Sequence, residues 1–245
     1  MWKRLRLICQ ETSAEMRWET KMETRVLEIR KGILNKNDEI ARRLRERLHA
    51  CGLLTINLVS SPGSGKTAFL QRTLRMLREA RIPAAALVED LATDNDAKRL
   101  AEAGVPVKQI NTDGRCHLEA QMISDHLADW DLNLFEYLFI ENVGNLVCPS
   151  SYDLGEDVRV VLLSVTEGED KPLKYPNIFN SADIAVITKM DLAEACEFDL
   201  EAAQRNIRAV RPGMRILRTS SKSGAGMEDW LECLAQEKSA RAAVV

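Results

Sequence analysis

The chain has 245 residues, of which 45% are hydrophobic and 29% charged, and its formal net charge is −3. This length is enough to bury a sizeable core, and the composition is ordinary for a soluble globular protein. The slightly acidic balance offers no basic field for nucleic acid, and no apolar run reaches the roughly 18 residues of a membrane span. We therefore expect a cytoplasmic protein with neither a nucleic-acid partner nor a membrane anchor.

The N-terminal part of the chain divides into two regions. Residues 1–23 carry mixed charge without an apolar face, which indicates a mobile leader. Residues 24–52 form an N-terminal helical extension, in which apolar residues recur at turn-like spacing. Asn37 and Asp38 can cap a second segment inside this extension, so one bent helix and two short helices both remain possible, and Gly52 ends it.

Residues 53–245 alternate short apolar runs with amphipathic stretches. The apolar runs, each expected to form a buried strand, are residues 54–59, 84–88, 107–110, 137–140, 158–165, 184–187 and 215–217. The helical patterns between them cover residues 68–80, 97–103, 118–127 and 201–210. Near-continuous apolar strands separated by helices indicate a mainly parallel sheet covered on both faces. The sequence thus predicts an α/β fold, a doubly wound three-layer α/β/α sandwich in one domain.

A glycine-rich loop lies between the first strand and the first helix of this domain. It reads SPGSGKT over residues 61–67, and it is preceded by Ser60 where the strict P-loop pattern has glycine. Glycines let backbone N–H groups turn towards phosphates, and the helix N-terminus adds positive potential. We expect Lys66 to reach the β- and γ-phosphates as a catalytic cation, and Thr67 to bind magnesium. The predicted phosphate-binding residues are Gly63, Ser64, Gly65, Lys66, Thr67 and Ala68.

A second motif, TKMD at residues 188–191, follows the sixth apolar run, where a GTPase carries Asn-Lys-x-Asp. The Asp191 carboxylate would accept two hydrogen bonds from guanine, whereas adenine offers neither proton and would leave the acid unpaired. Lys189 can lie along the face of the base, and SSK at residues 220–222 stands where another GTPase loop meets it. The sequence thus predicts a site for GTP and GDP. The predicted base-contacting residues are Thr188, Lys189, Asp191, Ser221 and Lys222.

Two segments carry candidate metal ligands, Cys116 with His117 and, further along, Cys148. Both segments follow predicted strand ends on the same edge of the sheet, where ligands bind in such folds. Thiolate and imidazole are suitable ligands for zinc or nickel. From the residues alone, packing of the Cys-His pair in the core is the alternative, because cysteine is among the most buried residue types. Both interpretations stay open at this point.

Taken together, these stretches resemble the hydrogenase nickel-incorporation GTPases, in the metal-insertion branch of the dimerising P-loop GTPases. The similar stretches are KNDEIA at 36–41, NLVSSPGSGKT at 57–67, DLATDNDA at 90–97, TDGRCHL at 112–118, ENVGNLVCP at 141–149 and TEGEDKP at 166–172. They lie within roughly residues 33 to 235. The resemblance implies a GTP-hydrolysing metallochaperone that assists nickel insertion into hydrogenase, together with a partner metallochaperone and the hydrogenase large subunit.

The same resemblance implies further site roles. Glu141 and Asp90 would join Thr67 at the magnesium ion, Asp90 through water, and Asp94 would position the attacking water in the first switch segment. Capping of a helix N-terminus is the alternative role for Asp90 and Asp94. The nickel or zinc ion would lie between two chains of a homodimer favoured by GTP and metal. Two chains together supply four thiolates and two imidazoles from Cys116, His117 and Cys148.

The chain departs from many members of that family near its N-terminus. Those members carry Cys-x-x-Cys-Gly-Cys or a histidine-rich tract there, whereas residues 1–35 hold one cysteine and no histidine. We therefore expect that high-affinity nickel site to be absent. The closest rival is a urease nickel-insertion GTPase, whose motif is Cys-Pro-His. A P-loop small-molecule kinase would leave Asp191 unexplained. A nucleotide-regulated scaffold with no metal role is a third alternative, and comparing the metal content of the wild type with that of a Cys148 variant separates the metal-binding interpretation from both.

Overall fold

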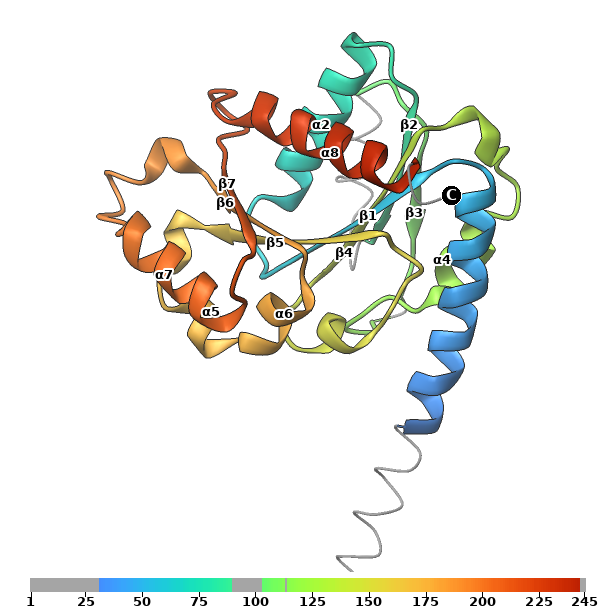
Figure 1. Cartoon of the computed structure of the whole chain (residues 1–245), viewed down its shortest axis with the longest axis horizontal. Helices are drawn as coiled ribbons and strands as arrows, with labels where there is room; N and C mark the ends of the chain where they lie inside the picture. The colour runs from blue at the N-terminus through green and yellow to red at the C-terminus, as the bar shows by residue number, and fades with distance from the viewer. Residues whose placement is uncertain (1–30, 90–102, 113, 243–245) are drawn as a thin grey trace, which may run out of the picture.

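The computed structural model of the chain describes residues 31–89, 103–112 and 114–242. The described residues form a seven-stranded sheet in the order β3-β2-β4-β1-β5-β6-β7, and every neighbouring pair of strands is parallel (Figure 1). The strands are β1 Leu54–Ser60, β2 Ala84–Glu89, β3 Val107–Ile110, β4 Tyr137–Gly144, β5 Val158–Ser164, β6 Ile184–Thr188 and β7 Arg215–Arg218. The predicted parallel α/β sandwich is confirmed.

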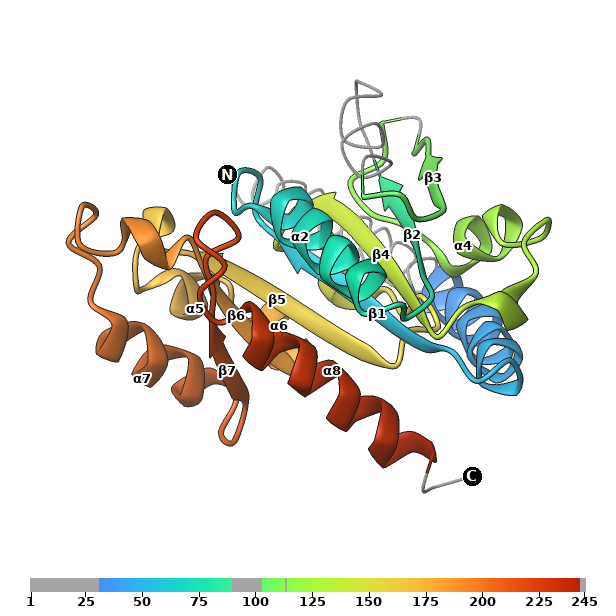
Figure 2. The same ribbon diagram turned by 90° about the horizontal axis from the view of Figure 1, so that it is seen from above.

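Helices cover both faces of this sheet. Helices α2 and α8 lie on one face, and the helix of residues 31–50 lies with α4, α6 and α7 on the other (Figures 1 and 2). The helices are 31–50, α2 Lys66–Glu79, α4 Ala120–His126, α5 Lys171–Lys174, α6 Pro176–Ser181, α7 Leu200–Val210 and α8 Met227–Ala242. Short 3-10 helices are η1 Leu132–Leu134, η2 Cys148–Ser151, η3 Val165–Glu167 and η4 Met190–Leu192.

The core follows from the alternation of side chains along each strand. In β2, Ala86 belongs to the cluster that contains Phe69 of α2 and Trp230 of α8, whereas its neighbour Leu87 packs with Leu48 of the N-terminal helix. Successive strand residues point to opposite faces, so a continuous apolar run serves both layers at once. This is why the strands could be recognised from uninterrupted apolar runs.

The N-terminal helix is continuous over residues 31–50. Of the two predicted forms, one helix or two short helices with a cap at Asn37 and Asp38, the described residues therefore show one helix. It ends at Gly52, whose φ of 72° is readily adopted by glycine, and Leu53 N–H donates to Leu48 O at 3.2 Å. Residues 1–30 lie outside the described part. The division of the chain at residues 23 and 52 therefore stays a prediction.

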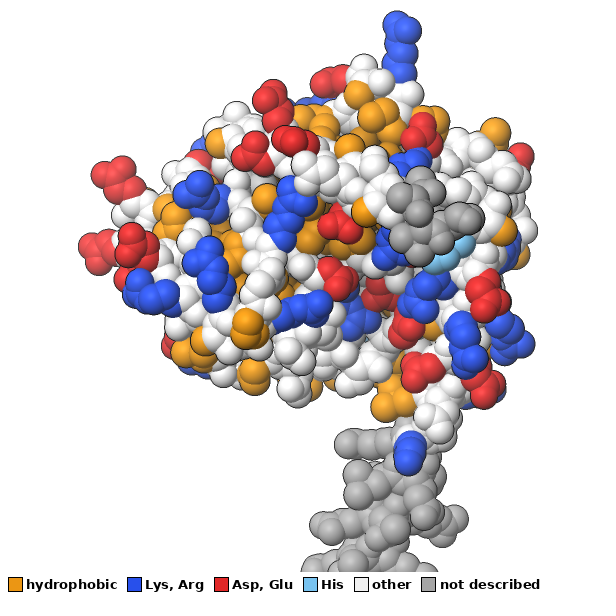
Figure 3. All heavy atoms as spheres, viewed as in Figure 1, with side chains coloured by type: hydrophobic (Ala, Val, Ile, Leu, Met, Phe, Trp, Pro, Cys, Tyr) orange, Lys and Arg blue, Asp and Glu red, His pale blue; other side chains and the backbone are white. Residues whose placement is uncertain are grey.

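The predicted strands all occur, with small differences at their ends. The largest difference is in β4, which runs on through Glu141 and Asn142 to Gly144. Helix α8 was not predicted, although Met227, Trp230 and other buried residues form its inner face. Within the described ranges, none of the helices combines the length and apolar character needed to cross a membrane. On the face seen in Figure 3, acidic and basic side chains are interspersed.

Candidate nucleotide and metal sites

The phosphate loop joins β1 to α2 at the carboxyl edge of the sheet. Gly65 has a φ of 95°, a conformation that L side chains rarely adopt. Gly144, at the end of β4, faces the loop closely, because a Cβ there would lie 3.2 Å from Pro62 Cα. Gly65 in the loop and Gly144 at the end of β4 thus allow the loop its shape and its place against the sheet.

Ser60, which replaces the first glycine of the strict P-loop pattern, is fully buried and takes part in the loop's hydrogen bonds. Its hydroxyl donates to Ser61 O at 2.8 Å and accepts from Lys66 Nζ at 3.0 Å and from the Ser64 hydroxyl. Position 60 ends strand β1 and has no left-handed backbone that would call for glycine. The serine therefore holds the loop and the Lys66 side chain in place.

The predicted magnesium ligands are partly brought together. Thr67 Oγ1, at the start of α2, donates to Glu141 Oε1 at 2.7 Å, and the Glu141 side chain is buried in β4. A hydroxyl and a carboxylate at this separation suit a hard divalent cation, so the pair fits magnesium. Asp90, the third predicted ligand, and Asp94, the predicted water-positioning residue, both lie outside the described residues.

The predicted base-contacting residues lie beside the phosphate loop. Thr188 ends β6, and its hydroxyl donates to Ser64 O at 2.7 Å. Lys189 takes a left-handed φ of 57°, and its ammonium group donates to Gly63 O at 2.7 Å. A non-glycine residue in that conformation is strained, and such strain is concentrated at functional sites.

The carboxylate of Asp191 is held by the first serine of the SSK motif, which was not among the predicted base-contacting residues. Ser220 is buried, and its hydroxyl donates to Asp191 Oδ1 at 2.6 Å. Ser221 and Lys222 follow on the same turn, half-buried and exposed respectively, while Ala68 is exposed in the first turn of α2.

The three predicted metal ligands come together at one place. Cys116 and His117 follow β3, and Cys148 opens η2 shortly after β4. Their ligand atoms all lie within 4.8 Å of one another, with Cys116 Sγ 2.8 Å from Cys148 Sγ and 3.6 Å from His117 Nδ1. Two sulfurs on one tetrahedral zinc ion are about 3.8 Å apart, so the two thiols would have to separate by about 1 Å to share an ion. The geometry fits one shared ion after this separation, and both cysteines are free thiols.

The thiol and the imidazole of this cluster differ in how readily they would bind a metal ion. The hydrogen bond to Cys148, with burial, raises the pKa of the Cys116 thiol. Burial lowers the pKa of His117, so its imidazole is neutral at physiological pH. A metal ion would therefore displace thiol protons and find the imidazole ready to coordinate. The exposure of Cys116 argues against the alternative of a core-packed Cys-His pair.

Two further residues hold the metal cluster in shape. The ring of Tyr152 stacks on His117 with a centroid distance of 3.8 Å and an angle of 22° between the planes. Asn145 Nδ2 donates to Cys116 O at 3.4 Å, while its Oδ1 accepts from Val147 N–H at 2.8 Å. The sequence did not identify either residue, because each acts on a segment that is distant along the chain.

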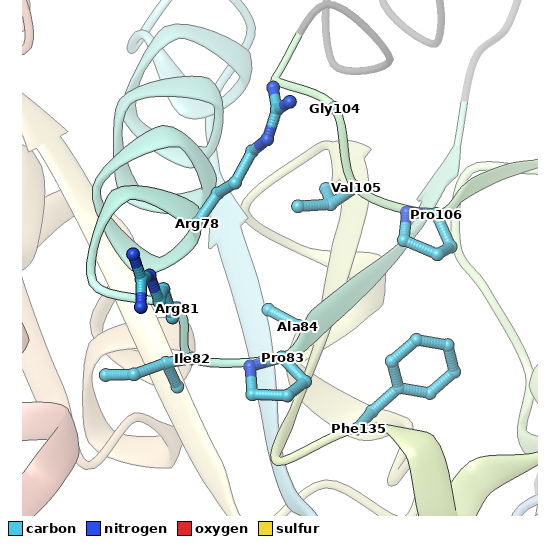
Figure 4. A pocket seen from close by; sticks show the side chains of 9 residues that line it. All are labelled: Arg78, Arg81, Ile82, Pro83, Ala84, Gly104, Val105, Pro106 and Phe135. Atoms are coloured by element: carbon cyan, nitrogen blue, oxygen red, sulfur yellow. The ribbon is translucent and has the colours of Figure 1, made fainter.

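A hollow at the far end of α2 is separate from both candidate sites. It has a volume of about 250 Å³ and lies between the end of α2 and the start of β2 (Figure 4). Arg78 borders it, donating to Ala103 O at 3.3 Å. Since the phosphate loop is at the start of α2, this hollow is at the opposite edge of the sheet and does not contribute to nucleotide binding.

The parallel sheet, the phosphate loop and the hydrogen-bonded Thr67–Glu141 pair define a P-loop NTPase. Residues 54–218 match the family CobW/HypB/UreG, nucleotide-binding domain. The hydrogenase maturation factor HypB of Azotobacter vinelandii is 48% identical over 219 residues, covering 89% of this chain and 72% of the relative. The hydrogenase/urease maturation factor HypB of Helicobacter pylori is 44% identical, covering 84% of this chain and 86% of the relative.

The structural comparison agrees with these sequence matches. The crystal structure of HypB from Helicobacter pylori in complex with nickel has a TM-score of 0.79 and 42% sequence identity, covering 84% of this chain and 96% of that one. The chain belongs to the CobW/HypB/UreG family and, within it, to the hydrogenase maturation factor HypB proteins. The resemblance noted from the sequence motifs is confirmed.

Proposed function

We propose that the protein is a GTP-hydrolysing metallochaperone, which binds nickel or zinc at Cys116, His117 and Cys148 and assists nickel insertion into hydrogenase. One observation carries this proposal: the two candidate sites share the end of β4. Glu141, in that strand, accepts the Thr67 hydrogen bond beside the phosphate loop, and Cys148 follows four residues after the strand ends at Gly144. A change in nucleotide at Glu141 would therefore act on the segment that carries a metal ligand.

Hydrolysis would use the residues of the phosphate loop. Water attacks the γ-phosphorus of GTP, the bond to the β–γ bridging oxygen breaks, and GDP and inorganic phosphate leave. Lys66 and the loop N–H groups stabilise the negative charge of the transition state. Thr67 and Glu141, with Asp90, are the residues that would hold magnesium, which neutralises phosphate charge when bound. Asp94 is our candidate for orienting the water.

Guanine specificity rests on Asp191. Its carboxylate, fixed by the Ser220 hydroxyl, would accept from the N1–H and the 2-amino group of guanine. Adenine has neither proton, so binding it would leave the carboxylate unpaired. Thr188 and Lys189 would support the base from the side of the phosphate loop.

A second copy of the chain would complete the metal site. A tetrahedral ion takes four ligands, whereas one chain offers two thiolates and one imidazole here. Cys116 is exposed, and the neighbouring side chain of Val147 is 62% exposed, so this surface is accessible to a second chain. We propose that GTP and metal favour a homodimer through this surface, and that hydrolysis releases the metal to a partner metallochaperone or the hydrogenase large subunit.

Nickel and zinc titrations, with and without GTP and followed by molecular mass, test this function. Replacing Cys116→Ser, His117→Ala or Cys148→Ser should abolish stoichiometric metal binding and the GTP-dependent shift from monomer to dimer. Cys196→Ser is the matched control, since Cys196 is also exposed but outside the cluster. Unchanged metal binding in the three cluster variants would refute the site.

The recipient enzyme is a separate question. Because one relative is named a hydrogenase/urease maturation factor, a urease remains the second candidate recipient. Adding the metal-loaded protein to nickel-free hydrogenase or nickel-free urease, and measuring which enzyme gains nickel on GTP addition, distinguishes them.

A further inference from the structure

The N-terminal helix contains a buried polar residue that the nucleotide and metal chemistry does not use. Asn37 is 6% exposed, although the neighbouring residues Lys36, Asp38 and Glu39 are exposed. A buried amide is costly unless both its oxygen and its nitrogen find hydrogen-bond partners. The partners of Asn37 therefore indicate what this side chain is for.

Asn37 bonds to two segments that are far from it in sequence. Its Oδ1 accepts from Ala120 N–H at 2.9 Å, and its Nδ2 donates to Asp153 O at 2.7 Å. Ala120 is the first residue of α4, and the preceding Glu119 makes no capping hydrogen bond with its side chain. Asn37 thus satisfies, from another helix, one of the N–H groups that a helix start leaves unpaired.

These two segments are the ones that carry the three candidate metal ligands. Ala120 follows His117 by three residues. Asp153 follows Cys148 by five residues and is adjacent to Tyr152, whose ring stacks on His117. The side-chain amide of Asn37 therefore joins the Cys116–His117 segment to the Cys148 segment on the buried side of the cluster. Asn145 makes a longer link near Cys116 on the more exposed side.

The helix that carries Asn37 is itself fixed against the Cys148 segment. A Cβ on Gly155 would lie 3.0 Å from Ala41 O, so the two backbones are in close contact. Arg45 donates to the Asp153 carboxylate and, through Nε, to Glu156 O at 3.1 Å. Asn37 cannot move away from Asp153 unless the helix moves as a whole.

We propose that Asn37 is a positioning residue for the metal site. It holds the two ligand segments at the separation at which Cys116, His117 and Cys148 share one ion, and so makes metal affinity depend on the N-terminal helix. The inference rests on the proposed metal-binding function of those three residues. Groups that orient metal ligands without touching the ion typically change metal affinity 10- to 100-fold when they are replaced.

Two variants of the full-length protein test the inference. Asn37→Asp keeps the shape and the acceptor for Ala120 but sets a carboxylate oxygen against the Asp153 carbonyl, and Asn37→Leu removes both bonds. Competition with a coloured zinc chelator should show zinc affinity lowered by about 10-fold or more in each variant. Affinity for GTP should stay within about twofold, because neither bond reaches the phosphate loop. If Asn37→Leu does not fold, Asn37→Asp alone decides.

The controls separate positioning from general loosening of the fold. Ile207→Val shortens a fully buried side chain in α7, which packs in a different cluster of the core. Urea unfolding measures the free energy of unfolding that each variant loses, so that this control can be compared with Asn37→Asp at a similar loss of stability. This control should bind zinc as the wild type does. Wild-type zinc affinity in folded Asn37→Asp protein, or equal loss in Ile207→Val, would overturn the inference. Cys148→Ser tests the underlying site: zinc binding that survives this change refutes the proposed function itself.

Discussion

The phosphate loop and the metal cluster are built in opposite ways. In the loop, Lys66 and Ser64 are buried, and the carbonyl oxygens of Gly63 and Ser64 accept hydrogen bonds from Lys189 and Thr188. In the cluster, Cys116 is exposed and Cys148 is half-buried. The described contacts of the loop come from side chains and backbone of one chain, whereas the proposed metal site would draw three ligands from one chain where a tetrahedral ion needs four.

This difference matches what each region would have to do under the proposed function. Stabilising the charge of phosphoryl transfer requires groups that are already in place, because reorganising them during the reaction costs energy. A metal that is passed on must be held at a site that can be completed and dismantled. We therefore regard the phosphate loop as the fixed part of the molecule and the metal cluster as the part whose completeness depends on a partner.

A buried polar network lies between the two regions. Asn142 Nδ2 donates to Asn57 Oδ1 at 3.3 Å, and Asn57 Nδ2 donates to Glu156 Oε1 at 3.0 Å. Arg159 pairs with Glu156 through Nε at 2.8 Å and donates to Tyr152 O at 2.6 Å. The network thus runs from the strands of the nucleotide site to the residue stacked on His117.

The largest effect is expected from breaking this network at Arg159. Arg159→Met should lower the free energy of unfolding by about 3 to 5 kcal/mol, because it leaves the Glu156 carboxylate buried without its cation. Urea unfolding measures the loss, and the double variant Glu156→Gln/Arg159→Met should recover part of it. Arg211→Met, at the more exposed Arg211–Asp183 pair, should cost about 1 kcal/mol or less. Equal losses of unfolding free energy at both arginines would show that the buried network stabilises the fold no more than an exposed ion pair does.

The next largest effect is expected at Lys66, the proposed catalytic cation of the phosphate loop. Lys66→Ala should slow GTP hydrolysis by about 100- to 1,000-fold, since it removes a preorganised positive charge from the γ-phosphate. Zinc affinity at the Cys116 cluster should be unchanged in the absence of nucleotide, because the ligand segments do not contact Lys66. Phosphate release assays and zinc competition measure the two quantities. Lys174→Ala, at an exposed lysine of α5, is the control that should hydrolyse GTP normally.

Exchanging the base-reading carboxylate should alter specificity more than fold. Asp191→Asn should weaken GTP binding by about 100-fold, since an amide cannot accept both guanine protons. Xanthosine triphosphate, which has a carbonyl in place of the 2-amino group, should bind this variant better than GTP. Competition with a fluorescent nucleotide measures both affinities. A variant that still prefers GTP would remove Asp191 from the base site.

Most of the fold and the centre of each site could be predicted from the sequence because the signals are local. Continuous apolar runs indicated the parallel strands, and a glycine-rich turn followed by Lys66 and Thr67 indicated the phosphate loop. The predicted strand of residues 137–140 ended too early, because it was drawn from apolar residues alone. Strand β4 continues through buried polar residues such as Asn142, whose side chain is hydrogen-bonded to that of Asn57. Helix α8 was missed although Met227 and Trp230 carry a three-residue spacing.

The supporting residues could not be predicted, because their partners are distant in sequence. Asn37 lies 83 residues from Ala120 and 116 from Asp153, and its only local signal suggested a helix cap. Ser220 meets Asp191 across 29 residues. Such contacts exist only once the sheet has brought strand ends together, so no pattern within a single segment reports them.

The smallest predicted effect concerns a thiol on the nucleotide side of the molecule. Cys233 of α8 is fully buried in the cluster beneath α2, unlike the exposed Cys116, and burial raises its pKa from 9.0 to about 11. Between these two values the unfolded chain loses the thiol proton while the folded chain keeps it. The unfolded state therefore binds fewer protons, and stability must fall as pH rises from about 9 to about 11.

Replacing Cys233 isolates this contribution from the other groups that titrate in the same range. Urea unfolding at about pH 8 and about pH 10 measures how far the free energy of unfolding falls between these two pH values. This fall should be about 1 kcal/mol smaller in Cys233→Ala than in the wild type. Cys196→Ala, at an exposed thiol, should keep the wild-type difference. An unchanged pH dependence in Cys233→Ala would mean that the core beneath α2 admits water. The packing of the nucleotide half would then be as open as that of the metal cluster, and the contrast between the two regions would be lost.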